Sequence, residues 1–230
     1  MRDMPKLESP FYREEINGKY VCVPKINDDY RWVFTDKAIA TEKLDGTNVS
    51  IIKVDGAIKI FNRTNYIDIW NSGGERFYNG IMNAFNRGYI NPHIIPEGKQ
   101  VFGELIGEKI QGNPYGIKGW LWIPLEKLIA SYAYRFWNTD IIPLLQNKSD
   151  TEIFHMVSDY MAILWSLMKR KYNPSLNHAV DKTITFSNNS YAAAEGIVFY
   201  HKEHLNEIPS DAWMCKLRRD MFDWYQGKEH

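Results

Sequence analysis

Hydrophobic positions along the chain repeat at two spacings. In residues 18–36 they alternate with polar positions around Val21, Val23, Trp32 and Phe34, and this alternation predicts strands. The first quarter of the chain is therefore expected to be rich in β-structure.

A second alternating stretch, Val49 to Phe61, is interrupted by Asp55-Gly56, a dipeptide that favours a tight hairpin turn. It predicts two antiparallel strands. Short aliphatic or aromatic runs predict further strands at residues 101–106, 119–123, 131–137, 196–201 and 211–217.

Helical spacing occurs in two segments. Residues 74–88 carry Phe77, Ile81, Ala84 and Phe85 three or four positions apart, which indicates a helix. The second helix is expected to begin at a cap among residues 149–151 and to run to Lys171. Its apolar stripe is Ile153, Val157, Tyr160, Met161, Leu164, Leu167 and Met168. Runs of strands broken by a few helices predict an α+β fold with antiparallel sheets and flanking helices.

Composition narrows the class of protein. The 230 residues are 44% hydrophobic and 14% aromatic, which excludes a disordered chain. Lys plus Arg equals Asp plus Glu at 28 each, so a polyanion must be held by a local patch rather than by the whole surface. No linker is evident, and we expect one domain over residues 1–230.

The number of cysteines and the length of the apolar runs indicate the cellular compartment in which the protein is expected. Cys22 and Cys215 are too few for a disulfide framework or a cysteine zinc site, and two reduced thiols indicate a cytoplasmic protein. No secretory or membrane-spanning apolar run is present, so no membrane association is expected. The segment HKEH places His201 and His204 three residues apart without further ligands nearby in the sequence, and it does not by itself predict a metal site.

The candidate chemistry begins at TEKLDGTNVS, residues 41–50. There Lys43 stands at the end of a predicted strand, before a glycine-containing turn. A partly desolvated lysine near other cations loses its proton more readily and can attack phosphorus or a carbonyl carbon. Taken alone, an ordinary surface lysine explains the pattern more simply.

Further segments in a fixed order change that interpretation. Together they resemble the motif set of the covalent nucleotidyltransferases, the superfamily of polynucleotide ligases and mRNA capping enzymes. The matching segments are KLDGTN at 43–48, FNRTN at 61–65, FGELIG at 102–107, AEGIVFY at 194–200 and MCKLRR at 214–219, with YRFWNTD at 134–140 as a looser match. The fold that this resemblance implies is the ATP-grasp-like adenylyltransferase domain of polynucleotide ligases.

Within the superfamily, the segment from Glu42 to Asn48 matches the EKxxGTN pattern of nick-sealing (type 2) RNA ligases. DNA ligases and capping enzymes usually carry arginine at the position of Asn48. The resemblance therefore favours an ATP-dependent RNA ligase that uses ATP and Mg²⁺. Beyond Lys216 only LRRDMFDWYQGKEH remains, and we expect the nucleotidyltransferase domain without an OB or helical C-terminal domain.

The resemblance implies catalytic roles for four residues. Lys43 is the expected nucleophile, which forms a lysyl-AMP intermediate. Lys216 and Arg218 leave the same face of a predicted strand and are expected to bind the α-phosphate. The family usually has lysine at the position of Arg218. Glu195 is expected to serve metal or phosphate chemistry and is the candidate Mg²⁺ ligand.

The remaining candidates would bind the nucleotide. The resemblance gives Glu104 the ribose and Arg63 the ribose or a phosphate, and it places Asn48 in the cofactor site. For Glu104 and Glu195, a simple surface ion pair is the alternative. Phe136 or Trp137 is expected to stack on adenine, with a plain core aromatic as the alternative. Glu42 is expected to contact the adenine edge.

The expected activity is the joining of 3′-hydroxyl and 5′-phosphate ends at nicks through lysyl-AMP. The substrate would be nicked or end-bearing nucleic acid, with an RNA 3′-hydroxyl strand favoured, and the protein is expected to be a monomer. A minimal DNA ligase, a capping guanylyltransferase and a non-catalytic nucleotide- or RNA-binding module on the same fold are the alternatives.

Overall fold

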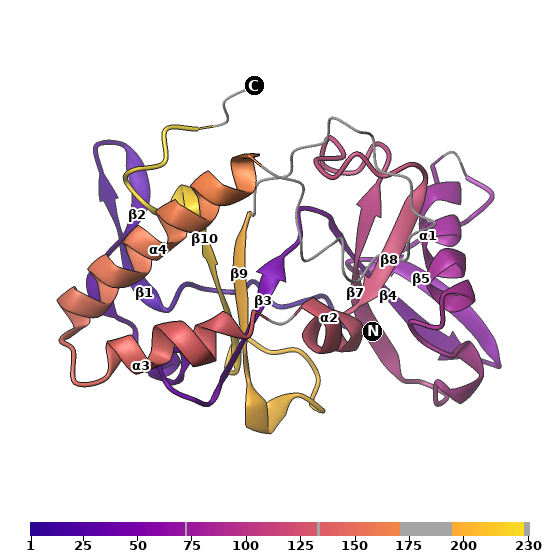
Figure 1. Cartoon of the computed structure of the whole chain (residues 1–230). Coiled ribbons are helices and arrows are strands. Elements are labelled where there is room, and N and C mark those ends of the chain that lie inside the picture. Colours follow the sequence, from indigo (N-terminus) through magenta and orange to yellow (C-terminus); the bar gives the residue numbers. More distant parts are fainter. Residues whose placement is uncertain (72, 133, 171–194, 228–230) are drawn as a thin grey trace. The chain divides into compact units, whose positions relative to one another are not determined.

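A computed structural model describes residues 1–71, 73–132, 134–170 and 195–227 (Figure 1). The chain divides into two compact units. The described part of the first unit comprises residues 1–4, 44–71 and 73–132. That of the second comprises residues 5–43, 134–170 and 195–227. Whether residues 1–230 act as one nucleotidyltransferase domain stays a prediction.

The first unit is built on a five-stranded antiparallel sheet in the order β6-β5-β4-β7-β8. Two α-helices and a 3-10 turn accompany it. The elements are β4 (Thr47–Val54), β5 (Ala57–Asn62), β6 (Asn65–Tyr66), α1 (Glu75–Asn86), η2 (Pro92–Ile94), β7 (Gln100–Gly107), β8 (Trp120–Pro124) and α2 (Leu125–Tyr132). Helix α1 packs on β8 and β7 (Figure 1), burying Phe77 and Ile81 against Leu105 and Trp122. The Trp122 indole N–H donates to the Val49 carbonyl at 3.0 Å, so this buried polar group is satisfied.

The second unit contains a two-stranded sheet, β1-β2, and a three-stranded antiparallel sheet in the order β10-β9-β3. Its helix α4 lies against β2. The elements are β1 (Phe11–Ile16), β2 (Lys19–Ile26), η1 (Asp28–Phe34), β3 (Ala38–Lys43), the π-helical turn η3 (Trp137–Ile141), α3 (Ile142–Leu145), α4 (Asp150–Arg170), β9 (Gly196–His201), η4 (Lys202–His204), β10 (Met214–Arg218) and η5 (Arg219–Met221).

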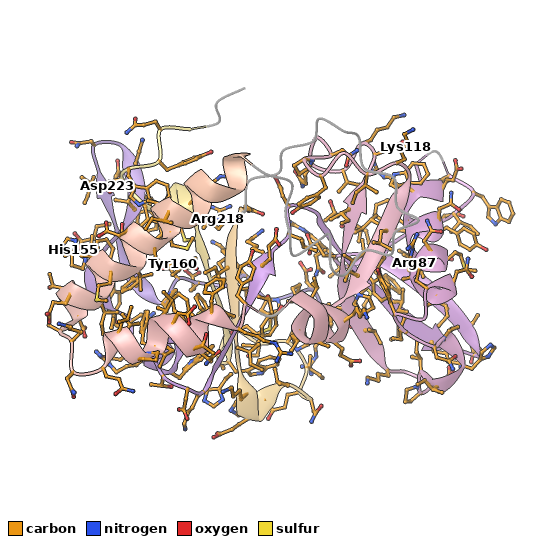
Figure 2. All side chains as sticks on the ribbon, in the orientation of Figure 1. Arg87, Lys118, His155, Tyr160, Arg218 and Asp223 are labelled. Atoms are coloured by element: carbon orange, nitrogen blue, oxygen red, sulfur yellow. The ribbon has the colours of Figure 1, made fainter. Side chains whose placement is uncertain are left out.

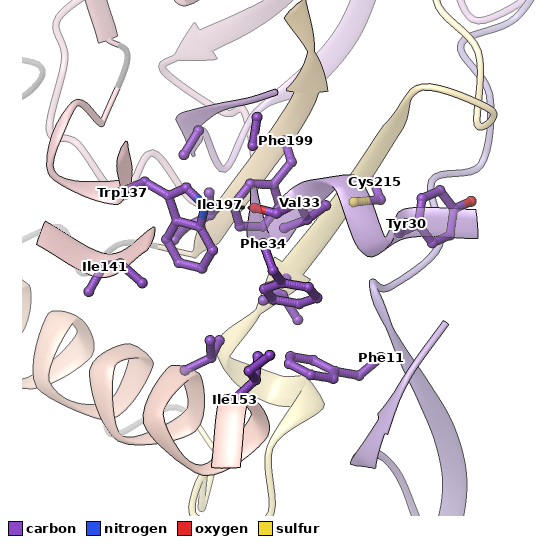
Figure 3. Close-up of a cluster of buried hydrophobic side chains, with 14 of the residues drawn as sticks. Phe11, Tyr30, Val33, Phe34, Trp137, Ile141, Ile153, Ile197, Phe199 and Cys215 are labelled. Carbon is purple, nitrogen blue, oxygen red and sulfur yellow. Dashed lines mark hydrogen bonds between the residues drawn. The ribbon is translucent and has the colours of Figure 1, made fainter. Parts of the chain in front are cut away.

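A single apolar core holds the second unit together (Figure 3). Trp137 packs against Phe199 of β9, with ring centroids 4.7 Å apart, and Ile153 of α4 joins the same core. Cys22 and Cys215 are buried free thiols, as expected, and burial raises the pKa of Cys22 to about 11.

The α+β class with antiparallel sheets is confirmed. The hairpin at Asp55-Gly56 connects β4 to β5, and both residues have positive φ, 52° and 76°, as such a turn requires. Helix α4 begins at a capping box in which the Ser149 N–H donates to the Glu152 carboxylate at 2.8 Å. The side chains of Leu164, Leu167 and Met168, which end the predicted apolar stripe of this helix, lie outside the described part of the structure.

Two predicted strands are wrong. Residues 28–34 form the 3-10 helix η1, whose N-cap Asn27 accepts a hydrogen bond from the Asp29 N–H. Its buried residues are Tyr30, Val33 and Phe34, which lie three and four positions apart as in a helix rather than alternating. Residues 131–132 end α2, and Trp137 begins the π-helical turn from which its side chain enters the core.

None of the helices in the described ranges is both long and apolar enough to cross a bilayer.

Candidate functional site

The β10-β9-β3 sheet brings the predicted catalytic residues of the second unit onto one face. Lys43 pairs with Gly196 on one side of β9, and Arg218 pairs with Gly196 on the other. Lys216 lies two residues from Arg218 on β10, opposite Val198. Because directly paired residues and residues two apart share a face, the three cationic side chains project from the same side.

Glu195 lies at the start of β9 and joins two of these cations. Its Oε2 accepts a hydrogen bond from Lys43 Nζ at 2.6 Å, and its Oε1 lies 3.8 Å from Arg218 Nη1. The Glu195 side chain is 16% exposed and that of Lys43 is 24% exposed. Solvent therefore screens this ion pair only in part.

Lys216 is half-buried in the same cluster. Burial lowers its pKa, and the positive charges of Arg218 and Lys43 lower it further, against opposing effects of Glu8 and Glu195. Its backbone N–H donates to the Glu8 carbonyl at 2.9 Å, which fixes β10 at this point. An ammonium held in such surroundings is stabilised by an incoming anion.

Arg218 has a partner that sequence reasoning missed. Nη2 of Arg218, the residue labelled in Figure 2, lies 3.0 Å from a carboxylate oxygen of Asp220 in η5, the turn that directly follows β10. Its Nε is buried and has no hydrogen-bond partner in the part of the chain that the structure describes. A buried donor of this kind is suited to a phosphate oxygen, so the cluster fits the phosphates of a nucleotide.

The second unit separates the two aromatic candidates. Phe136 is half-buried. It stacks on Tyr134 at a centroid distance of 4.9 Å and contacts Tyr160 in a tilted arrangement at 5.2 Å. Trp137 is 0% exposed, and its N–H donates to the Val33 carbonyl, so it packs as a core aromatic (Figure 3). Glu42, opposite Ile197 of β9, is buried and faces away from the Lys43 face.

The first unit gathers three nucleotide-site candidates at one end of its sheet. Asn48 of β4 pairs directly with Glu104 of β7, and its Nδ2 donates to the Gly103 carbonyl at 3.4 Å. Arg63 is exposed in the β5–β6 turn, one residue beyond the last β4–β5 pair, Val49–Asn62. Asn48, near the start of β4, therefore lies between Glu104 on the neighbouring strand β7 and the turn that carries Arg63 after β5.

The first unit also explains the glycine that follows the nucleophile. A Cβ on Gly46 would lie 2.6 Å from the Leu105 carbonyl oxygen and 2.8 Å from Cγ of Glu104, so only glycine fits. The Asp45 N–H donates to the hydroxyl of buried Tyr115 at 2.6 Å. Sequence reasoning missed Tyr115, and its only signal is an aromatic residue set between Pro114 and Gly116.

Comparisons with known proteins bear on the family to which this chain belongs. A profile of the RNA ligase family matches residues 36–214. A comparison with curated proteins gave no match.

Among solved structures, the chain is similar to a Naegleria gruberi RNA ligase with PPi at 16% identity and a TM-score of 0.42, over 80% of this chain and 50% of that one. A mutant of the same ligase with ATP and Mn gives 14% identity, a TM-score of 0.44, and 94% and 61% coverage. An apo mutant gives 16%, 0.44, and 96% and 58%. The chain thus spans 50–61% of the length of these ligases.

The family match supports an RNA ligase-like nucleotidyltransferase domain. The chain belongs to the RNA ligase family.

Proposed function

We propose that this chain is an ATP-dependent RNA ligase of the nick-sealing type that acts through lysyl-AMP. The observation that carries the proposal is the convergence of Lys43, Lys216, Arg218 and Glu195 on one sheet face. Three cations around a single carboxylate suit a nucleophile that must meet a phosphate.

In the first step, Nζ of Lys43 attacks the α-phosphorus of ATP. A nitrogen–phosphorus bond forms, the bond to the bridging oxygen breaks, and pyrophosphate leaves. The amine must first release its proton and leave Glu195, to which it donates at 2.6 Å. Lys216 and Arg218 bind the α-phosphate oxygens and stabilise the charge that develops on them.

In the later steps the AMP passes to a 5′-phosphate, and the 3′-hydroxyl of the other strand then attacks that phosphate and releases AMP. The predicted nucleotide contacts of Glu42, Asn48, Arg63, Glu104 and Phe136 belong to this proposal. Mg²⁺ would neutralise phosphate charge when bound, and Glu195 offers it a carboxylate oxygen.

The test is transfer of label from ATP to the protein. The full chain is incubated with α-labelled ATP and Mg²⁺, and the adduct is resolved on a denaturing gel. We expect acid-labile labelling that disappears in Lys43→Ala, and also in Lys43→Arg because a guanidinium stays protonated.

Lys118→Ala, at an exposed lysine (Figure 2), is the matched control and should label like the original chain. Labelling that persists in Lys43→Ala would place the nucleophile elsewhere. Preferential labelling by GTP would indicate a capping enzyme, and no labelling by any nucleotide would indicate a non-catalytic module.

A further inference from the structure

The turn after β9 gathers metal-binding side chains that the ligase chemistry does not use. His201, Glu203 and His204 each offer one ligand atom, and these atoms all lie within 4.8 Å of one another. The sequence shows two histidines three apart. The structure adds the carboxylate of Glu203 between them and that of Glu207 beside them.

Hydrogen bonds set which ring nitrogens carry lone pairs. Nδ1 of His204 lies 2.7 Å from Oε1 of Glu207. An ionised carboxylate only accepts hydrogen bonds, so Nδ1 carries the hydrogen, and in the neutral ring Nε2 keeps a lone pair for a metal. A carboxylate behind a metal-binding histidine is the usual arrangement that orients the ring.

Nδ1 of His201 accepts the backbone N–H of Glu203 at a long 3.3 Å, so this nitrogen also presents a lone pair toward the turn. A bound ion would replace only this weak contact.

Aromatic packing holds the two rings. Trp32 contacts the His201 ring edge-on at a centroid distance of 5.2 Å, and Trp213 stacks on His204 at 6.4 Å. The backbone of the turn is also anchored, because the His201 N–H donates to the Trp213 carbonyl at 3.0 Å. The two imidazole rings therefore lose little conformational freedom when a metal ion binds.

We propose that His201, Glu203 and His204 bind a divalent transition-metal ion of the Zn²⁺ class, with Glu207 orienting His204. Two imidazoles and one carboxylate suit Zn²⁺, Co²⁺ or Ni²⁺, whereas Mg²⁺ and Ca²⁺ prefer all-oxygen sets. Water completes the coordination. Gly196 pairs with Lys43 and lies five residues before His201, so this site is about 17 Å along β9 from Lys43 at 3.3 Å per strand residue.

Lys37 opposes metal binding. Its Nζ lies 3.6 Å from Oε1 of Glu203, and it would repel a divalent ion at that carboxylate. Replacing Lys37 therefore distinguishes a metal site from a turn that is merely rich in histidine.

The experiment titrates the full chain, stripped with chelator, with Zn²⁺ by calorimetry and with Co²⁺ by visible absorption. We expect saturable one-to-one binding of both ions and none of Mg²⁺. Because Glu203 is exposed and His204 is partly exposed, their variants should fold. Glu203→Gln and His204→Ala should each weaken Zn²⁺ binding by more than about tenfold, and Glu207→Gln by about 10–100-fold.

Lys37→Met should tighten Zn²⁺ binding, and His155→Ala on α4, away from the turn, should leave it unchanged (Figure 2). Absence of saturable Zn²⁺ binding, or affinity unchanged in a Glu203→Gln and His204→Ala double variant, would overturn the proposal. Labelling of Lys43 by ATP is read separately, so failure of the metal site leaves the ligase proposal intact.

Discussion

At the residue scale, Lys216 is held in surroundings that oppose its own charge. Burial and the neighbouring cations Arg218 and Lys43 lower its pKa, so the folded chain binds this proton less tightly than the unfolded chain does. Below the lowered pKa the fold carries the full penalty of a buried charge. The penalty disappears as the pH rises through the folded pKa toward the unfolded value.

We therefore expect Lys216→Met to stabilise the protein while it removes activity. At neutral pH the Tm should rise by about 2–4 °C, the shift that 1 kcal/mol gives at this chain length. The gain should shrink as the pH rises through the folded pKa of Lys216. ATP labelling should fall about 10²–10³-fold, the usual effect of losing one group that stabilises transition-state charge.

Thermal melts at several pH values and label transfer on the same preparations measure both effects. Lys25→Met, at an exposed position of β2, is the matched control and should change neither. A lower Tm in Lys216→Met at neutral pH would show that the ammonium is already well compensated in the ligand-free chain.

The local sequence predicted the residues of the Lys43 cluster, which are Lys43, Lys216, Arg218 and Glu195. It did not predict the more distant residues that contact this part of the chain. Lys216 and Arg218 could be placed together because strand alternation fixes the face of residues two apart. Tyr115 and Asp220 could not be found in this way. The Asp45 contact with Tyr115 spans 70 residues, and the Asp220 contact depends on a tight turn after β10.

At the element scale, β9 is the strand on which the cluster depends. It is central in its sheet, and Gly196 lies between Lys43 and Arg218. A Cβ at Gly196 would lie 2.0 Å from the Leu217 carbonyl oxygen and 2.8 Å from Cα of Arg218. Any larger residue must push β10 away.

Gly196→Ala should therefore destabilise the protein by about 1–3 kcal/mol, the usual effect of overpacking, and reduce ATP labelling. Urea unfolding followed by tryptophan fluorescence measures the first effect and label transfer the second. Gly18→Asn is the control, because Gly18 has a φ of 77° with nothing within 4 Å of its Cβ position, and asparagine tolerates such a φ. Equal stability of Gly196→Ala and the original chain would mean that β10 moves aside freely.

Most helices and strands could be predicted from the periodicity of hydrophobic residues. The segments for which this prediction was wrong share one cause. In residues 28–34 and 131–137 the runs are short and aromatic, and such runs fit a strand or a helical turn equally well. Their structure is decided by packing, since Val33 and Trp137 enter a core assembled from distant strands and from α4. Long amphipathic segments such as α1 and α4 do not have this ambiguity.

At the scale of the whole molecule, the charge balance limits how nucleic acid can be attracted. The chain carries 28 basic and 28 acidic residues, so its long-range field is weak. In the proposed function, adenylylation of Lys43 needs groups around one phosphate. Sealing of a nick requires many phosphates to be bound through local lysine and arginine contacts.

We accordingly expect the joining of a nick with an RNA 3′-hydroxyl strand to fall steeply between low and physiological salt, because each phosphate contact releases counterions on binding. Formation of lysyl-AMP should change little over the same range. Two salt titrations on one preparation, read as protein adduct and as joined strand, make the comparison. A parallel decline of both activities would show that nick binding is not the weak step.

The carboxylate of Glu195 also bears on selectivity. The Glu195 carboxylate partly neutralises the positive charges of Lys43 and Arg218, since it contacts both side chains. A nucleotide that binds here must displace the Glu195 carboxylate from the two cations. A single small anion makes too few new contacts to offset the loss of this ion pair. Free phosphate or sulfate should thus be held weakly, whereas a ligand that brings a base, a sugar and several phosphates together can displace the carboxylate. In the proposed ligase, the ion pair would therefore reduce the binding of inorganic anions at this site.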